Sequence, residues 1–177
     1  TIFRPATFIE TAIENLGWSL AIGILLVVLI LIAFLMQWRT TVISLVSIPL
    51  SLIAAVAVLQ SQDVTMNVMV IAGLVVSIGV VVDDAIIDTE NIVRRLRQHE
   101  GPRTFADVYR IVVDGSVEVR SAIIYATLID VVAITPVFFL EGLSGAFFKP
   151  LVLAYGVAVL ASMVVATTVT PAMCLLL

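Results

Sequence analysis

Residues 16–36 of this chain read LGWSLAIGILLVVLILIAFLM, a run without a charged side chain. A helix needs about 20 apolar residues to cross a hydrocarbon core of about 30 Å, so this run is long enough to span a membrane. Trp18 and Trp38 stand at its two ends, about 30 Å apart along a helix, which is the spacing expected of interfacial aromatic anchors. The run therefore predicts a transmembrane helix over residues 16–38.

The composition of the whole chain favours the same class of protein. Of its 177 residues, 62% are hydrophobic and 12% are charged, and the mean hydropathy is +1.21. Soluble domains have about 45–50% apolar and about 25% charged residues. A soluble enzyme domain, a disordered linker and a nucleic-acid-binding module are therefore excluded. The single cysteine, Cys174, excludes an internal disulfide and a cysteine-based zinc site.

Four further stretches are long and apolar enough to span a membrane, and they cover residues 41–59, 64–93, 121–140 and 151–176. Thr104 and Asp107 have the spacing of a capping box, and apolar residues follow at helical intervals. We therefore expect a short amphipathic helix over residues 104–113 on the cytoplasmic face, ending at Asp114-Gly115. The predicted fold is all-α, with five transmembrane helices in a domain over residues 16–177. Residues 1–15 are predicted to end an external, periplasmic region.

Basic residues predict the orientation of these helices, because they are enriched in cytoplasmic loops. Only Arg4 and Lys149 would face the outside. The other seven basic residues would face the cytoplasm: Arg39, Arg94, Arg95, Arg97, Arg103, Arg110 and Arg120. We therefore expect the N-terminus of this chain outside the cell and its C-terminus inside. An outside N-terminus without a signal peptide indicates an internal fragment of a longer membrane protein.

Acidic residues lie within two of the predicted spans. Asp83 is 11 residues from Arg94, or about 16 Å along a helix, which places Asp83 and Asp84 near the membrane midplane. Asp130 is 10 residues from Arg120 and falls at the same depth on another helix. Each ionised carboxylate at the centre of a membrane helix costs about 2.5–3.5 kcal/mol, so such groups normally have a function. Carboxyl groups of this kind can bind and release protons.

Helical geometry divides the polar residues of this span into two stripes, because adjacent side chains point about 100° apart. One stripe holds Ser77, Asp84, Asp88, Asn91 and Arg95, and the other holds Asp83, Glu90 and Arg94. Gly73 and Gly79 are expected to let a neighbouring helix approach closely. A purely structural role, in which the acids only hydrogen-bond helices together, remains an alternative.

The stretch from Gly79 to Asn91, GVVVDDAIIDTEN, resembles the fourth transmembrane helix of the resistance–nodulation–division (RND) efflux pumps, with their paired-aspartate motif. The resemblance covers essentially the whole chain. It includes residues 34–39 (FLMQWR), 136–142 (PVFFLEG), 145–150 (GAFFKP) and 170–174 (TPAMC). Leu140-Glu-Gly142 followed by Phe148-Lys-Pro150 resembles the heavy-metal branch more than the drug branch.

This resemblance implies helices 2–6 of the N-terminal half of a 12-helix transporter in the bacterial inner membrane. It implies a proton-driven antiporter in which Asp83 and Asp84 relay protons. Asp88, Asp130 and Glu90 are possible accessory residues, although Asp88 and Asp130 are extra to the usual pattern of the drug pumps. The exported substrate is expected to be a metal cation, and no cofactor or resident metal site is expected. The family resemblance also implies a homotrimer with a periplasmic adaptor and an outer-membrane channel.

Three alternatives stay open at this point. The chain could belong to a multidrug exporter of the same family, because the double aspartate is typical of drug pumps. It could belong to a proton-driven accessory of the Sec translocation machinery, although the usual motif there has a single aspartate. It could also be a membrane scaffold without a transport role. An enzyme has no support, since the chain has no P-loop and no HExxH motif.

Overall fold

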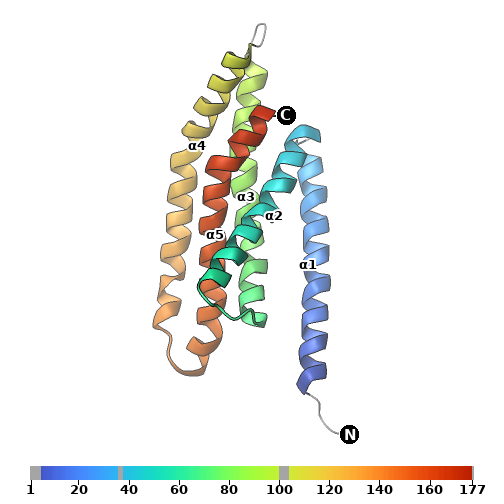
Figure 1. The fold of residues 1–177 in the computed structure, drawn as a ribbon, viewed down its shortest axis with the longest axis vertical. Helices are drawn as coiled ribbons and strands as arrows, with labels where there is room; N and C mark the ends of the chain where they lie inside the picture. The colour runs from blue at the N-terminus through green and yellow to red at the C-terminus, as the bar shows by residue number, and fades with distance from the viewer. Residues whose placement is uncertain (1–4, 36–37, 100–103, 177) are drawn as a thin grey trace.

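The computed structural model describes residues 5–35, 38–99 and 104–176, and the described residues form five α-helices and one short 3₁₀ helix. In chain order the elements are α1 (Pro5–Leu35), α2 (Trp38–Ser61), α3 (Val68–Gln98), α4 (Phe105–Ile134), η1 (Thr135–Phe139) and α5 (Gly142–Leu176). Helices α3 and α5 lie side by side at the centre, with α4 on one flank and α2 and then α1 on the other (Figure 1). The predicted all-α class is therefore confirmed.

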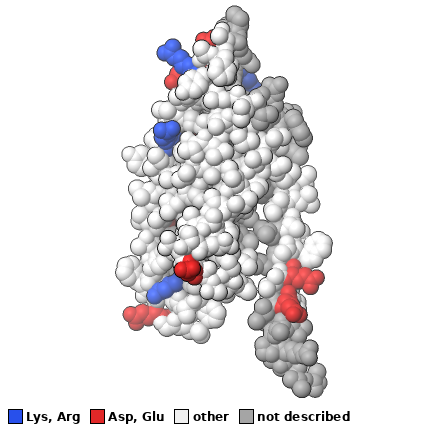
Figure 2. Space-filling model, viewed as in Figure 1, with Lys and Arg blue, Asp and Glu red and all other residues white. Residues whose placement is uncertain are grey.

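Four of the described segments are long and apolar enough to cross a membrane: Thr40–Ser61, Val68–Gln98, Phe105–Phe139 and Gly142–Leu176. The span expected over residues 16–38 falls largely on α1, where the side chains of residues 30–35 lie outside the described set, so it stays a prediction. Helix α1 begins at Pro5, and residues 5–15 therefore continue the helix of residues 16–35. On the face in Figure 2, charged side chains lie mostly toward the two ends, with a broad uncharged band between them.

The expected short helix over residues 104–113 is wrong as a separate element, because a single helix, α4, runs through it and onward to Ile134. Asp114-Gly115 does not end the helix. A Cβ atom on Gly115 would lie 3.3 Å from Cγ1 of Ile92, so the glycine serves the close approach of α3 and α4. The predicted capping box is present, and the backbone N–H of Thr104 donates to the Asp107 carboxylate at 3.2 Å.

The turn between α4 and α5 also differs from the expected boundaries of 140 and 151. Helix α4 ends at Ile134, two residues before Pro136, which has no N–H to continue an α-helix. The 3₁₀ helix η1 follows, and α5 begins at Gly142, whose φ of +66° is readily adopted only by glycine. At the start of α3 the side chain of Asn67 accepts a hydrogen bond from the backbone N–H of Val70 at 3.0 Å.

Small residues line the contact between α3 and α5. A Cβ atom on Gly73 would overlap the carbonyl oxygen of Leu151, and Ala154 and Ala158 are fully buried. The expectation of a close helix approach at Gly73 is therefore confirmed. Gly79 has no described neighbour within 4 Å of where its Cβ would be, so that part of the expectation finds no support in the described residues.

Helix α4 is the least covered of the four spanning helices. Only 11% of its most apolar window is buried inside the bundle, compared with 39% in α2, α3 and α5. Its exposed apolar side chains include Tyr125, Leu128, Ile129 and Val132. Most of α4 is therefore exposed at the surface of the described bundle, and only a small part of it packs against the other helices.

Candidate functional site

The first of the two stripes predicted for α3 faces the interior of the bundle over most of its length. The side chains of Ser77, Asp84, Asp88 and Asn91 are all buried, with at most 5% of their surface exposed. Helix α3 is enclosed by α2, α4 and α5, and the period of 3.6 residues keeps these four side chains on the enclosed face. Four of the five residues of this stripe therefore form an internal polar surface, and the fifth, Arg95, is partly exposed.

The second stripe faces away from the described helices. Asp83 and Glu90 are exposed, and so is Arg94. The two neighbouring aspartates thus have different surroundings, Asp83 on the surface of the described bundle and Asp84 inside it. This division follows from the helical rotation of about 100° per residue, as the sequence predicted.

Asp84 is 4% exposed and accepts a hydrogen bond from the Ser162 hydroxyl of α5 at 2.8 Å. A buried carboxyl group needs such a partner, because an unpaired polar group in an apolar interior is costly. Gly73 lies three turns earlier on α3, where α3 and α5 make backbone contact. The same helix pair therefore holds both the close contact and the hydrogen-bonded aspartate.

Asp130 belongs to the same region. It is half-buried on α4, and its charge acts on Asp84 and on Tyr155 of α5. The prediction that Asp130 lies at the depth of Asp84 on a different helix agrees with this arrangement. Three helices thus bring polar groups together at this level of the bundle.

Asp88 lies one turn beyond Asp84 and is 1% exposed. Neither of its carboxylate oxygens has a hydrogen-bond partner among the described residues. Ser116 of α4 lies beside it without meeting hydrogen-bond geometry, and its buried hydroxyl is also without a partner there. Asp88 is therefore the most enclosed carboxyl group of the stripe and the least satisfied.

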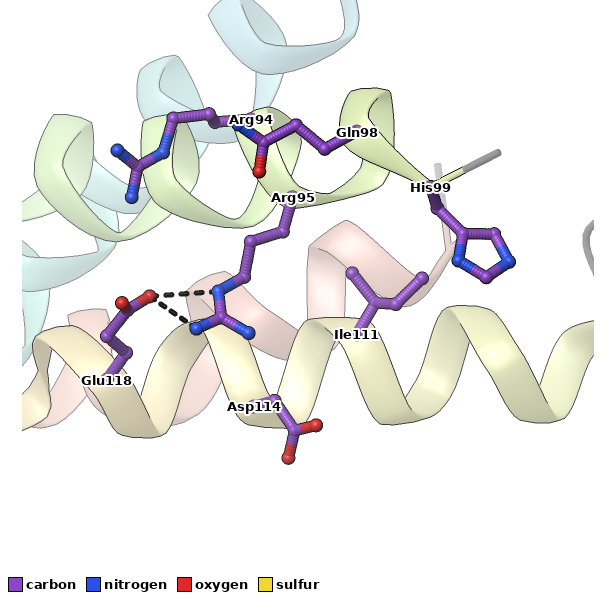
Figure 3. A pocket seen from close by; sticks show the side chains of 7 residues that line it. All are labelled: Arg94, Arg95, Gln98, His99, Ile111, Asp114 and Glu118. Carbon is purple, nitrogen blue, oxygen red and sulfur yellow. Dashed lines mark hydrogen bonds and ion pairs between the residues drawn. The ribbon is translucent and has the colours of Figure 1, made fainter. Parts of the chain in front are cut away.

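A hydrogen-bonded cluster joins α3 to α4 beyond Asp88. Nδ2 of Asn91 donates to the carbonyl oxygen of Gly115 at 2.7 Å and to Oε2 of Glu118 at 2.9 Å. Nε and a terminal nitrogen of Arg95 both contact the same Glu118 oxygen at 2.8 Å (Figure 3). Arg94 donates to Oδ1 of Asn91 at 2.5 Å. Asn91 is thus the buried residue that ties the two helices together.

Glu118 and Ser162 were not among the residues singled out from the sequence. Glu118 had a usable signal, because it lies one turn after Gly115, and small residues mark a close helix contact. Ser162 had none, because a serine in an apolar helix is common and its partner is 78 positions away. Among the described residues, no group of three or more His, Cys, Asp or Glu side chains is placed to hold a metal ion.

Comparison with known proteins places this arrangement in a family. A sequence profile of the AcrB/AcrD/AcrF family matches residues 1–177. The chain is 33% identical over 163 residues to the swarming motility protein SwrC of Bacillus subtilis, and this alignment covers 92% of the chain and 15% of SwrC. It is 31% identical over 176 residues to the cation efflux system protein CusA of Escherichia coli, and this alignment covers 97% of the chain and 17% of CusA.

The fold has a solved counterpart. The crystal structure of a heavy metal efflux pump superposes with a TM-score of 0.79 at 26% identity, over 96% of this chain and 16% of that one. The chain thus spans about one sixth of the length of these relatives. These similarities confirm the resemblance to RND efflux pumps and to their heavy-metal-like branch. Because a profile of the AcrB/AcrD/AcrF family matches this chain over residues 1–177, the chain belongs to that family.

Proposed function

We propose that the chain is the proton-carrying part of an exporter that uses proton influx to drive substrate out across the bacterial inner membrane. The observation that carries the proposal is the place of Asp84, a carboxyl group enclosed among apolar helices and held by one hydroxyl of α5. Charged residues inside membrane helices normally belong to ion or proton paths. The family supports the same function, since CusA is by name a cation efflux protein.

Asp83 and Asp84 have separate roles in this proposal. Asp84 holds α3 against α5 through Ser162, and a change in its protonation alters that hydrogen bond. Asp83 is exposed on the face of α3 that no described helix covers. We expect the other half of the transporter to cover this face and to supply the lysine that the family resemblance implies as a partner of the aspartate pair. Proton binding then changes the contacts of α3 on both sides.

The substrate proposed is a metal cation, and the partners proposed are those of the family: a homotrimer, a periplasmic adaptor and an outer-membrane channel. The similarity to CusA and to a heavy metal efflux pump supports the metal. The proposed orientation has the N-terminus outside. It is supported by the shared position of Arg94, Arg95 and Arg110 near the junction of α3 and α4, whereas Lys149 lies near the α4–α5 turn.

The test is transport by the full-length parent protein in liposomes. Zn(II), Cu(I) and a cationic dye are offered with and without a pH gradient. We expect gradient-dependent transport of a metal ion that is lost in Asp83→Asn and in Asp84→Asn. The control is Asp63→Asn, which removes an exposed carboxylate in the turn between α2 and α3, at the end of α3 opposite Arg94, and we expect it to transport normally. Transport that survives both motif substitutions would refute the relay and favour the accessory or scaffold role, and transport of the dye alone would favour a drug pump.

A further inference from the structure

The unsatisfied polar atoms around Asp88 are the feature that the proposed relay leaves unexplained. Both carboxylate oxygens of Asp88 and the hydroxyl of Ser116 are buried without a partner among the described residues. Buried polar groups are nearly always paired with protein or with internal water, and an internal water makes about three hydrogen bonds. These three atoms therefore have the number and the chemistry to hold a bridging water.

An open cleft lies between α3 and α4 at the arginine-rich end of the bundle, beyond this pair. Its volume is about 430 Å³, and its walls include Arg94, Arg95, Asp114 and Glu118 (Figure 3). The carboxylate of Glu118 forms part of the wall and also reaches inward to Asn91, which is 5% exposed. Solvent in the cleft therefore contacts the first member of a chain of polar groups that continues into the bundle.

The polar groups continue from the cleft toward Asp84 at intervals of about one helical turn. Asn91 bonds the carbonyl of Gly115, and the next residue on α4 is Ser116. Asp88 is three residues before Asn91 on α3, and Asp84 is four residues before Asp88. One turn of helix rises about 5.4 Å, a distance that a single water molecule bridges between two side chains. Asp88 thus lies between the cleft and Asp84.

We propose that Asp88 is a second proton-binding carboxyl group, which with Ser116 and internal water connects Asp84 to the cleft at the arginine-rich end. The inference rests on the proposed function above. In the step from Asp84 to the cleft, Asp88 as carboxylate takes the proton that Asp84 releases, and then transfers it to water in the cleft. Each transfer breaks one O–H bond and forms another, and Asp88 returns to its carboxylate form.

The charged and titratable groups around Asp88 come from three helices. Asp84 is on the same helix, Arg120 acts on Asp88 from α4, and Cys174 is its neighbour on α5. The part of α2 over residues 40–61 contains no charged residue. The pH dependence of a proton site at Asp88 is therefore set by the enclosure of the site first, and then by Ser116 and Arg120.

The first arm of the test measures the site itself in the full-length wild-type protein in liposomes. Dicyclohexylcarbodiimide reacts with protonated carboxyl groups in apolar surroundings, and mass spectrometry of the modified protein identifies the labelled residue. We expect Asp88 to be labelled, and labelling to fall as the pH rises over the range of about 5 to 9 because the group releases its proton. Labelling that does not change with pH would overturn the proposal, and so would protection by Na⁺ at constant pH, which would indicate a sodium site.

The second arm measures transport with the same preparation. We expect Asp88→Asn to slow gradient-driven transport at least about a hundredfold, the lower end of the effect of one positioned proton-transfer group. Ser116→Ala should slow transport to a smaller extent. Asp88→Glu keeps the carboxyl group and should retain part of the rate, so it tests the proposal even if Asp88→Asn folds poorly. The control is again Asp63→Asn, at the end of α3 opposite the cleft. Wild-type transport by Asp88→Asn, with transport lost in Asp84→Asn, would overturn this inference alone, whereas transport retained in both would overturn the proposed function.

Discussion

The contact between α3 and α5 at Gly73 allows a quantitative prediction about stability. The change is Gly73→Ala, which adds a single methyl group. In the structure that methyl would overlap the backbone carbonyl oxygen of Leu151 and would lie 3.1 Å from Cβ of Ala154. A carbonyl oxygen within a helix cannot rotate away as a side-chain tip can. The two helices must therefore part by about 1 Å to reach an ordinary carbon–oxygen contact.

Two effects of opposite sign determine the magnitude. Alanine favours a helix over glycine by about 1 kcal/mol, which stabilises the variant. Overpacking a well-packed contact costs about 1–3 kcal/mol, and the cost here is toward the upper end because backbone must move. We therefore expect the free energy of unfolding to fall by about 1–2 kcal/mol, the difference between the two effects. The Ser162–Asp84 hydrogen bond, on the same helix pair, should weaken with it.

The assay is denaturation of the full-length protein in mixed micelles as the fraction of dodecyl sulfate is raised, followed by circular dichroism. The matched control is Gly156→Ala on α5, whose added methyl would meet only the end of the Ile134 side chain, at 3.2 Å. That side-chain tip can move, so the helix-propensity gain should leave the control close to the wild type or slightly above it. The reasoning is refuted if Gly73→Ala is as stable as Gly156→Ala.

Two further predictions concern the hydrogen bonds between helices. Asn91→Ala removes the donors to Gly115 and Glu118, so we expect it to lower the midpoint of the same denaturation curve. Asn91→Asp should lower it at least as much, because its carboxylate cannot donate and repels Glu118; a stable Asn91→Asp would contradict the role given to the amide. Ser162→Ala removes the described hydrogen bond to Asp84, and we expect the transport rate in liposomes to change its pH dependence. A pH profile identical to that of the wild type would show that Ser162 does not act on Asp84.

Local patterns were enough to predict much of the fold and part of the site. Membrane helices are recognised by length and hydropathy alone, because every turn of the span lies in apolar lipid and must be apolar on the side that faces it. The two stripes of α3 followed from the helical period, which is also local. The division of Asp83 from Asp84 could therefore be predicted without any knowledge of the neighbouring helices. The length of α4 could not be predicted in this way. The pair Asp114-Gly115 is equally typical of the end of a helix and of a close contact between two helices.

Only the tertiary structure decided which partners these residues have. The hydroxyl bound to Asp84 comes from 78 positions away, and the carboxylate bound to Asn91 from 27 positions away. Such pairs depend on which helices pack together and in what rotation, and hydropathy says nothing of either. The same holds for Asp88. In the sequence it is one of several acidic residues, and only the packing of α3 against α4 and α5 makes it the most enclosed carboxyl group of the stripe. The sequence by itself thus determined that carboxyl groups lie within the membrane, and the packing decided which of them are enclosed and what surrounds them.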